Sequence, residues 1–217
     1  VFNSIQGNKN AGCVLIYGEN CNALKSFSAG GDISEYPSFR FNEASLREFH
    51  EVDVWGGLQA MLACDVPIVA RIDGACMGAG VEMASCCDIR IASASAKFGA
   101  PIAKLGFPMA PKEAEVVVRA AGEMTAREML LEAAVLDAPT MLQRGFLNRV
   151  VADADVASAV MQSVNRILAL APQAARLNKQ TFRGLNTQNP YAYADSAEHQ
   201  EGISAFMAKR KPQWAEE

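Results

Sequence analysis

The sequence predicts an α/β core that extends to about residue 151 and a helical region from residue 152 to residue 217. Two observations predict this division. Before residue 152, short apolar runs alternate with segments whose apolar residues recur at helical spacing, which is typical of strands that alternate with helices. After Asp153, every apolar pattern has helical spacing. The 217 residues are enough for one domain with a sizeable core.

In the first half of the chain, short apolar runs predict buried strands at residues 13–17, 68–72 and 89–92. Between the first two strands, apolar residues recur every three or four positions over residues 43–63, which predicts an amphipathic helix. A short helix is expected from about residue 80. Residues 1–5 are expected to be the end of another helix, directly before the first strand.

In the second half, residues 112–121 are expected to form a helix that Gly122 closes at its C-terminal end. Thr125 and Glu128 have the spacing of a capping box, which predicts the start of the next helix. Residues 146–151 are expected to form a strand. Pro172 divides the last part of the chain into two helices, because proline cannot lie in a helix interior without breaking it.

The composition argues against several classes of protein. A net charge of −4 does not favour nucleic acid as a partner, because phosphate binding needs a basic patch. The six cysteines include no Cys-x-x-Cys pair, so we expect reduced thiols and no metal site. No apolar run approaches the roughly 20 residues of a membrane helix. No signal peptide is visible, and we expect a cytoplasmic location.

The sequence contains two glycine-rich bends, at residues 27–32 (FSAGGD) and 74–80 (GACMGAG). Each is expected to follow a strand and lead into a helix, where backbone N–H groups lack partners inside the helix. Nucleotide phosphates are one candidate ligand, but the glycine spacing matches neither common phosphate-binding motif. The bends can instead hold an oxygen that gains charge during a reaction, or serve only as tight turns.

Four segments in register resemble the crotonase family, also known as the enoyl-CoA hydratase/isomerase family: FSAGGD at 27–32, PIVARIDG…GAGVEMASCCDIRIA at 67–92, KFGAPIAKLGF at 97–107 and EGISAFMAKRKPQW at 201–214. The resemblance implies a spiral of ββα units with C-terminal helices that form a trimer, often paired into a hexamer. Compared with the family, the chain is expected to lack the first strand, the following turn and most of the first helix, either because it is truncated or as a fragment whose edge strand is exposed or replaced. The apolar stripe on the helices after Asp153 (Val156, Val160, Val164, Ile167 and Leu168) is expected to need a partner surface.

The resemblance implies an acyl-CoA thioester as substrate and no metal or redox cofactor, since coenzyme A is part of the substrate. The backbone N–H groups of Gly31 and Ala79 would hold the thioester oxygen, and Glu82 would activate water as an acid/base. The residues implied to contact the substrate are Ala29, Asp32, Ile33, Ile102, Phe206 and Lys209. The last two act in the family across a subunit boundary.

The sequence departs from the family at the second catalytic glutamate, whose place Ile102 takes. Three consequences are open. Glu82 alone performs the proton transfers, a nearby acid such as Glu113 substitutes, or the protein binds acyl-CoA with little turnover. A different acyl-CoA reaction, such as decarboxylation or dehalogenation, is a further alternative. We expect the chain to hydrate crotonyl-CoA only weakly. The variant Ile102→Glu is expected to hydrate it faster.

Other polar residues are expected to be structural. His50 is interpreted as a surface residue of the helix over 43–63, and Glu113 as a solvated carboxylate at a helix start. Ser85 has no histidine and acid beside it that would activate it as a nucleophile. Asp32 is expected to cap a helix, and Asp88 to accept hydrogen bonds from backbone N–H groups.

Overall fold

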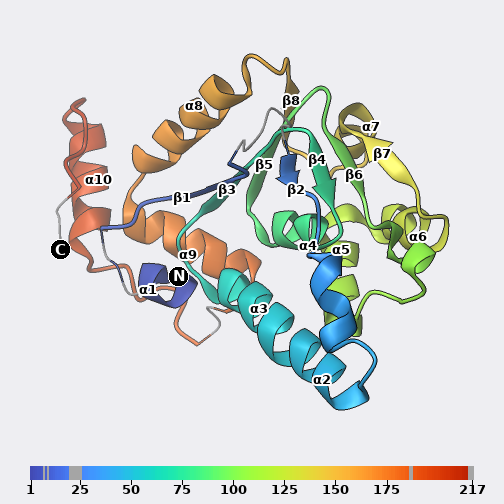
Figure 1. The fold of residues 1–217 in the computed structure, drawn as a ribbon. Helices are drawn as coiled ribbons and strands as arrows, with labels where there is room; N and C mark the ends of the chain where they lie inside the picture. Colours follow the sequence, from blue (N-terminus) through green and yellow to red (C-terminus); the bar gives the residue numbers. More distant parts are fainter. Residues whose placement is uncertain (7, 9, 20–25, 186–187, 215–217) are drawn as a thin grey trace.

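The computed structural model describes residues 1–6, 8, 10–19, 26–185 and 188–214, and its described strands form two four-stranded sheets (Figure 1). The first sheet is parallel and has the order β1 (Val14–Tyr17), β3 (Ile68–Ile72), β5 (Ile89–Ser93) and β8 (Arg149–Val151). The second has the order β2 (Ser26–Ser28), β4 (Ala75–Met77), β6 (Lys97–Gly99) and β7 (Val135–Asp137), with only β7 antiparallel to its neighbour. The predicted α/β core is confirmed.

The chain alternates between the two sheets and then adds a helix. β3 lies in the first sheet, β4 in the second, and α4 (Ala79–Cys86) follows; β5 and β6 repeat this order before the next helices. Val69 of β3 pairs with Leu15 on one side and Ile89 on the other, so successive turns stack in register. The repeat brings the loops after β2, β4 and β6 to one end of the second sheet, where the two glycine-rich bends lie.

The other helical elements, in chain order, are α1 (Phe2–Gln6), the 3₁₀ helix η1 (Ile33–Ser38), α2 (Glu43–Glu48), the π-helical turn η2 (Phe49–Val54), α3 (Trp55–Ala63), the 3₁₀ helix η3 (Pro101–Leu105), α5 (Pro111–Ala121), α6 (Glu123–Leu131), α7 (Ala138–Gln143), α8 (Val156–Leu168), α9 (Pro172–Phe182) and α10 (Ala197–Met207). The predicted helix over residues 43–63 is confirmed, with a π-helical turn inside it. Pro172 begins α9, as predicted.

Gly122 confirms one helix boundary and corrects another. It closes α5 with φ of 82°, a conformation that glycine adopts without strain, and it also precedes the first residue of α6. The helix therefore begins at Glu123, and the capping box predicted at Thr125 is wrong. Thr125 lies inside the first turn and is buried, so the tight turn at Gly122 takes the place of a side-chain cap.

The apolar stripe of α8 packs within the chain. Val156, Val160 and Val164 are buried against Val69 and Ile91 of the first sheet. The expectation that this stripe needs another subunit is therefore wrong for these three positions, because the sheet face supplies the surface. Leu168, at the end of the stripe, is half exposed.

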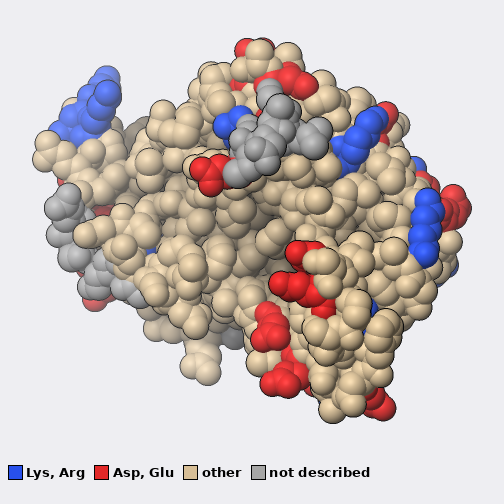
Figure 2. All heavy atoms as spheres, viewed as in Figure 1, with Lys and Arg blue, Asp and Glu red and all other residues tan. Residues whose placement is uncertain are grey.

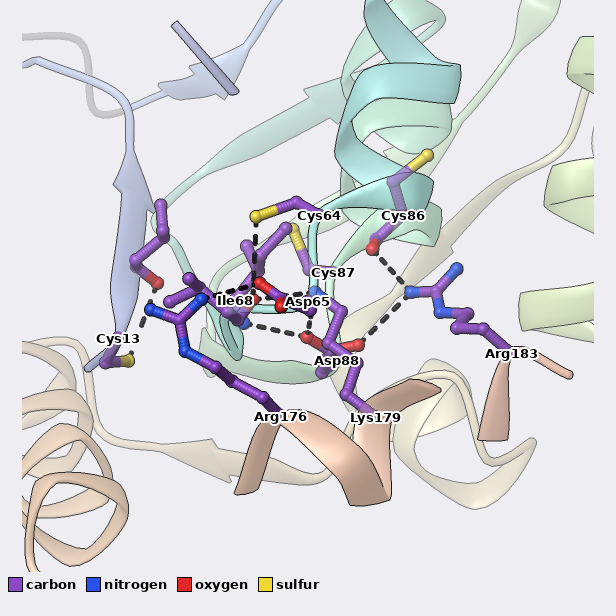
Figure 3. A network of polar contacts seen from close by, with 12 residues as sticks. Cys13, Cys64, Asp65, Ile68, Cys86, Cys87, Asp88, Arg176, Lys179 and Arg183 are labelled. Carbon is purple, nitrogen blue, oxygen red and sulfur yellow. Dashed lines mark hydrogen bonds and ion pairs between the residues drawn. The ribbon is translucent and has the colours of Figure 1, made fainter. Parts of the chain in front are cut away.

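A network of polar contacts joins α9 to the first sheet (Figure 3). Asp88 accepts hydrogen bonds from the backbone N–H of Ile68 at 2.7 Å and from Lys179 Nζ at 2.8 Å, and it pairs with Arg183 at 3.2 Å. Lys179 is buried and also donates to the Val66 carbonyl. The predicted role of Asp88 as an acceptor of backbone donors is confirmed, and the two cations extend it.

We expect Asp88→Ala to lower the free energy of unfolding by about 3 kcal/mol, because it leaves the buried Lys179 ammonium without its carboxylate. Urea denaturation at pH 7 measures the change. Glu123→Ala is the matched control, since Glu123 pairs with Arg127 at the exposed surface of α6, where removal costs less than about 1 kcal/mol. A loss equal to that of the control would contradict the role of the network.

On the face drawn in Figure 2, Lys and Arg side chains lie in several separate places and form no single basic patch. Acidic side chains gather over the lower part of this view, where α2 and the π-helical turn carry exposed Glu43, Glu48, Glu51 and Asp53. No helix in the described part of the chain is long and apolar enough to cross a membrane.

Candidate active site

The two glycine-rich bends lie against each other. Gly30 and Gly78 have φ of 103° and 51°, conformations that L side chains rarely adopt. A Cβ atom on Gly78 would lie 3.7 Å from the Cα atom of Gly30, and one on Gly80 only 2.8 Å from the Cβ atom of Ser28. The glycines therefore permit the start of α4 to approach the backbone that follows β2.

The backbone donors predicted at these bends have few partners. Ala79 is the first residue of α4, so its N–H group has no acceptor inside the helix. The N–H group of Gly31 donates to no acceptor among the described residues. Both residues line one cavity of about 400 Å³. Two backbone donors thus lie at the border of a space that can hold a small acyl group.

Six of the predicted site residues line this cavity, namely Ala29, Gly31, Ile33, Ala79, Glu82 and Ile102. Asp32 does not; its carboxylate caps η1 by accepting from the Ser34 N–H at 2.9 Å, as the predicted cap requires. Phe206 and Lys209 are also absent from the lining. Phe206 lies near the end of α10 and Lys209 just after it, both are exposed, and Figure 1 draws α10 well apart from α4. A role for them across a subunit boundary stays a prediction.

Glu82 faces the cavity from the first turn of α4 and is only 6% exposed. Burial, and secondly the nearby charge of Glu113, raise the pKa of its carboxyl group to about 8. No donor among the described residues hydrogen-bonds to this carboxylate, so no hydrogen bond from that part of the chain opposes the upward shift. Glu82 therefore carries a proton over most of the range below pH 8.

We expect this raised pKa to make the folded state less stable as pH rises. Between about pH 4.5 and pH 8 the folded chain keeps a proton on Glu82 that the unfolded chain has lost. The free energy of unfolding therefore falls with pH in this window, by up to about 1.4 kcal/mol per pH unit. Glu82→Gln has no such titration and should be more stable than the parent at pH 8.

Urea denaturation of both proteins at pH 5 and pH 8 measures this difference, with Glu48→Gln on the exposed face of α2 as the control. An equal pH dependence in the parent and in Glu82→Gln would show that Glu82 titrates in the same way in the folded and unfolded chains.

His50, which is partly buried, and Glu113, which is buried, form a pair in the same cavity. His50 Nδ1 lies 2.7 Å from Glu113 Oε1, and Glu113 is only 3% exposed. The expectations of a surface histidine and a solvated glutamate are therefore wrong. His50 lies in the π-helical turn, where the wider backbone spiral changes side-chain directions relative to a regular helix. Glu113 lies in the first turn of α5, which borders the cavity.

Arg40 completes this chain of polar groups. Its Nη2 atom lies 3.4 Å from His50 Nε2, and its guanidinium carbon lies 4.3 Å and 3.7 Å from the ring centroids of Tyr36 and Phe107, which meet edge to face. Arginine has only donors, so Nε2 accepts and the Nδ1–H group donates to Glu113. Arg40 lies after η1 in a stretch with no motif, so the sequence carried no signal for it.

The cavity therefore combines two backbone donors, two carboxylates in different surroundings, and an apolar wall that includes Ile102. Of these two carboxylates, only that of Glu113 has a hydrogen-bonding partner among the described side chains. Such a pair can give and accept protons on one bound molecule. Within the described ranges, no three His, Cys, Asp or Glu side chains are grouped as they would be around a metal ion.

Comparisons with known proteins agree on one group. The family model described as "Enoyl-CoA hydratase/isomerase" matches residues 1–217. The chain is 32% identical over 200 residues to a protein of Syntrophomonas wolfei named crotonyl-CoA hydratase, a match that covers 86% of this chain and 75% of the relative. It is 30% identical over 214 residues to a Mycobacterium bovis protein named probable enoyl-CoA hydratase echA8, covering 94% and 80%.

The solved structures agree with the fold. A structure titled enoyl-CoA hydratase/carnithine racemase from Magnetospirillum magneticum superposes with a TM-score of 0.92 at 34% identity, covering 100% of this chain and 83% of the other. A Legionella pneumophila structure titled putative enoyl CoA hydratase/isomerase (crotonase) superposes with a TM-score of 0.85 at 27% identity, covering 99% and 85%. These matches confirm the predicted spiral of ββα units.

Proposed function

Because the chain belongs to the enoyl-CoA hydratase/isomerase family, we propose that it adds water to the double bond of an enoyl-CoA thioester. The observation that carries this proposal is that Glu82 and Glu113 line one cavity with the two glycine-rich bends. The name of the Syntrophomonas wolfei relative, crotonyl-CoA hydratase, supports the same reaction. No cofactor beyond the coenzyme A of the substrate is needed for it.

The backbone N–H groups of Gly31 and Ala79 polarise the thioester carbonyl in this proposal. Negative charge moves to the thioester oxygen as water attacks the β-carbon, and two donors fixed beforehand stabilise that charge without rearranging. Their place at the border of the cavity supports the role. Each donor in such an arrangement contributes about 3 kcal/mol to lowering the barrier.

Glu82 and Glu113 divide the proton transfers. Glu113, an acceptor oriented by the Nδ1–H group of His50, takes a proton from water as the water oxygen bonds to the β-carbon. Glu82, which holds a proton below about pH 8, gives it to the α-carbon. An O–H bond of water, the O–H bond of Glu82 and the π bond of the C=C unit break, while the β-carbon–oxygen, α-carbon–hydrogen and Glu113 O–H bonds form. Glu82 therefore ends the step without its proton, and Glu113 ends it with one. A proton exchange with solvent resets the pair.

This assignment reverses the role that the family resemblance implies for Glu82, which there activates water. It also selects one of the three consequences of Ile102, namely that Glu113 replaces the missing acid. Ile102 then forms part of an apolar wall beside the acyl chain. If Glu113 takes no part in the reaction, Glu82 alone moves a proton between two carbons of the acyl group. That chemistry suits isomerisation of the double bond.

Turnover of a panel of enoyl-CoA thioesters, read as the loss of the conjugated double bond, tests the proposal. The expected result is a saturable hydration of at least one panel member, with the β-hydroxyacyl product identified by mass spectrometry. Tight binding of acyl-CoA without any turnover would instead support a binding member of the family. Release of carbon dioxide or halide would support another reaction on this fold.

We also propose that three copies assemble through the C-terminal helices. The described part of α10 carries exposed Ile203, Phe206 and Met207, a surface that a neighbouring subunit can cover. We expect light scattering at micromolar concentration to report three or six times the mass of one chain, and a stable monomer would contradict the proposal. Contacts of Phe206 and Lys209 with the neighbour's substrate, and a cytoplasmic location, stay predictions.

A further inference from the structure

Arg40 brings a positive charge to the cavity that no carboxylate in the described ranges pairs with. Its contacts among the described residues are the rings of Tyr36, Phe49 and Phe107 and one nitrogen of His50. Its Nε atom is buried without a hydrogen-bond partner among the described residues. A guanidinium has five N–H donors; the Nε–H of Arg40 is covered by the protein and one Nη2 donor faces His50, which leaves the remaining Nη donors to a bound molecule.

The neighbouring carboxylates do not neutralise this charge directly. Glu113 is held by His50, so one imidazole ring separates it from Arg40. Within the described residues no hydrogen bond or ion pair joins Glu82 to Arg40, and Glu82 carries a proton near neutral pH. The other cation of the lining, Lys104, is exposed to solvent. Arg40 is therefore the lining cation that aromatic rings partly screen from water, and such a cation favours an anionic partner.

We propose that the acyl group of the substrate carries a second carboxylate at its far end, which Arg40 binds. The substrate class is then a short dicarboxylic acid joined to coenzyme A through one carboxyl group. This inference rests on the proposed function, and it names the substrate class of the same site. The two rings pack against the guanidinium, and its fork of donors matches both oxygens of a carboxylate.

The arrangement also limits the length of the acyl group. The reacting carbons must lie between Glu82 and Glu113, and only the His50 ring separates Glu113 from Arg40. The second carboxylate therefore follows the double bond closely. A five-carbon acyl group, with one methylene between the β-carbon and the carboxylate, fits this order, and glutaconyl-CoA is its unsaturated form.

A binding experiment that needs no turnover tests the inference. Glutaryl-CoA and butyryl-CoA are saturated and cannot be hydrated, and they differ in the terminal carboxylate. We expect the parent protein to bind glutaryl-CoA at least about 30-fold more tightly than butyryl-CoA, as measured by calorimetry. Glutaryl-CoA whose carboxylate is blocked as the methyl ester should lose that preference. Equal affinity for the three esters would overturn the proposal.

Arg40→Met assigns the preference to this side chain. The ratio of the affinities for glutaryl-CoA and butyryl-CoA should fall to within about threefold of unity. Methionine still packs against the rings of Tyr36 and Phe107 but removes the charge. Arg47→Met is the matched control, since Arg47 lies on α2 and pairs with Glu43 and Glu51 outside this cavity. A ratio that stays at its parental value in Arg40→Met would also overturn the proposal.

Failure of the proposed function gives a different pattern. If glutaconyl-CoA is not hydrated but glutaryl-CoA still binds preferentially through Arg40, the carboxylate site is correct and the hydration is wrong. If crotonyl-CoA is hydrated and glutaryl-CoA has no advantage, the hydration is correct and the carboxylate site is wrong.

Discussion

Glu82→Gln is expected to lower kcat/KM for enoyl-CoA hydration by about 10³-fold or more. Glutamine has the shape of the protonated side chain but cannot give a proton to the α-carbon, and general acid catalysis of this kind contributes roughly 10² to 10⁴ in rate. The barrier to attack by water also rises, because charge on the thioester oxygen is no longer drawn off by proton transfer. Initial rates at matched protein concentration measure the effect.

The control for this variant is its affinity for a saturated acyl-CoA. Glutamine is close in volume to the protonated glutamate, so the cavity keeps its shape and binding should change by less than about threefold. A variant that binds normally and hydrates at the parental rate would show that Glu82 is not the proton-transfer residue. A variant that has also lost its affinity for the saturated acyl-CoA would show that Glu82 shapes the cavity.

Glu113→Gln has the second largest expected effect, a loss of about 10² to 10³ in kcat/KM. It removes the acceptor for the proton of water while Glu82 stays in place. It also removes the second cause of the raised pKa of Glu82. The upper limb of the pH profile of any remaining activity should therefore move to lower pH, a shift that a merely structural glutamate outside the cavity would not produce.

His50→Gln separates positioning from proton transfer. The amide can still donate one hydrogen bond to Glu113, so the loss in kcat/KM should be smaller than in Glu113→Gln, about tenfold, with the pH profile retained.

Because the groups act together, the double variant of Glu82 and Glu113 should be little slower than the slower single variant. Additive losses would mean that the two carboxylates do not take part in one step.

Most of the fold follows from local patterns in the sequence. The strands at residues 68–72 and 89–93 are short apolar runs, and the helices over residues 43–63 and 156–168 have regular apolar spacing. These features are fixed by burial on one face, which periodicity reports directly. The start of α6 was predicted wrongly, because Gly122 both ends one helix and begins the next, and side-chain capping rules do not describe such a turn.

The site was only half visible in the sequence. Gly31 lies in one family motif and Ala79 and Glu82 in another, so the family resemblance could locate them. His50, Glu113 and Arg40 come from three separate segments, and only the packing of η2, α5 and the stretch after η1 brings them together. A helical wheel over residues 43–63 assumes one repeat throughout, and the π-helical turn breaks that assumption at His50.

The π-helical turn at Phe49–Val54 has a consequence for how this site can change over time. A regular helix turns about 100° per residue, so losing a single residue from the wide turn would swing the preceding part of the helix by about that angle. Its hydrogen bonds would return to the ordinary ladder, while Phe49 and His50 would face another side. The chemistry of the cavity therefore depends on chain length as well as residue identity, and relatives of different length need not share it.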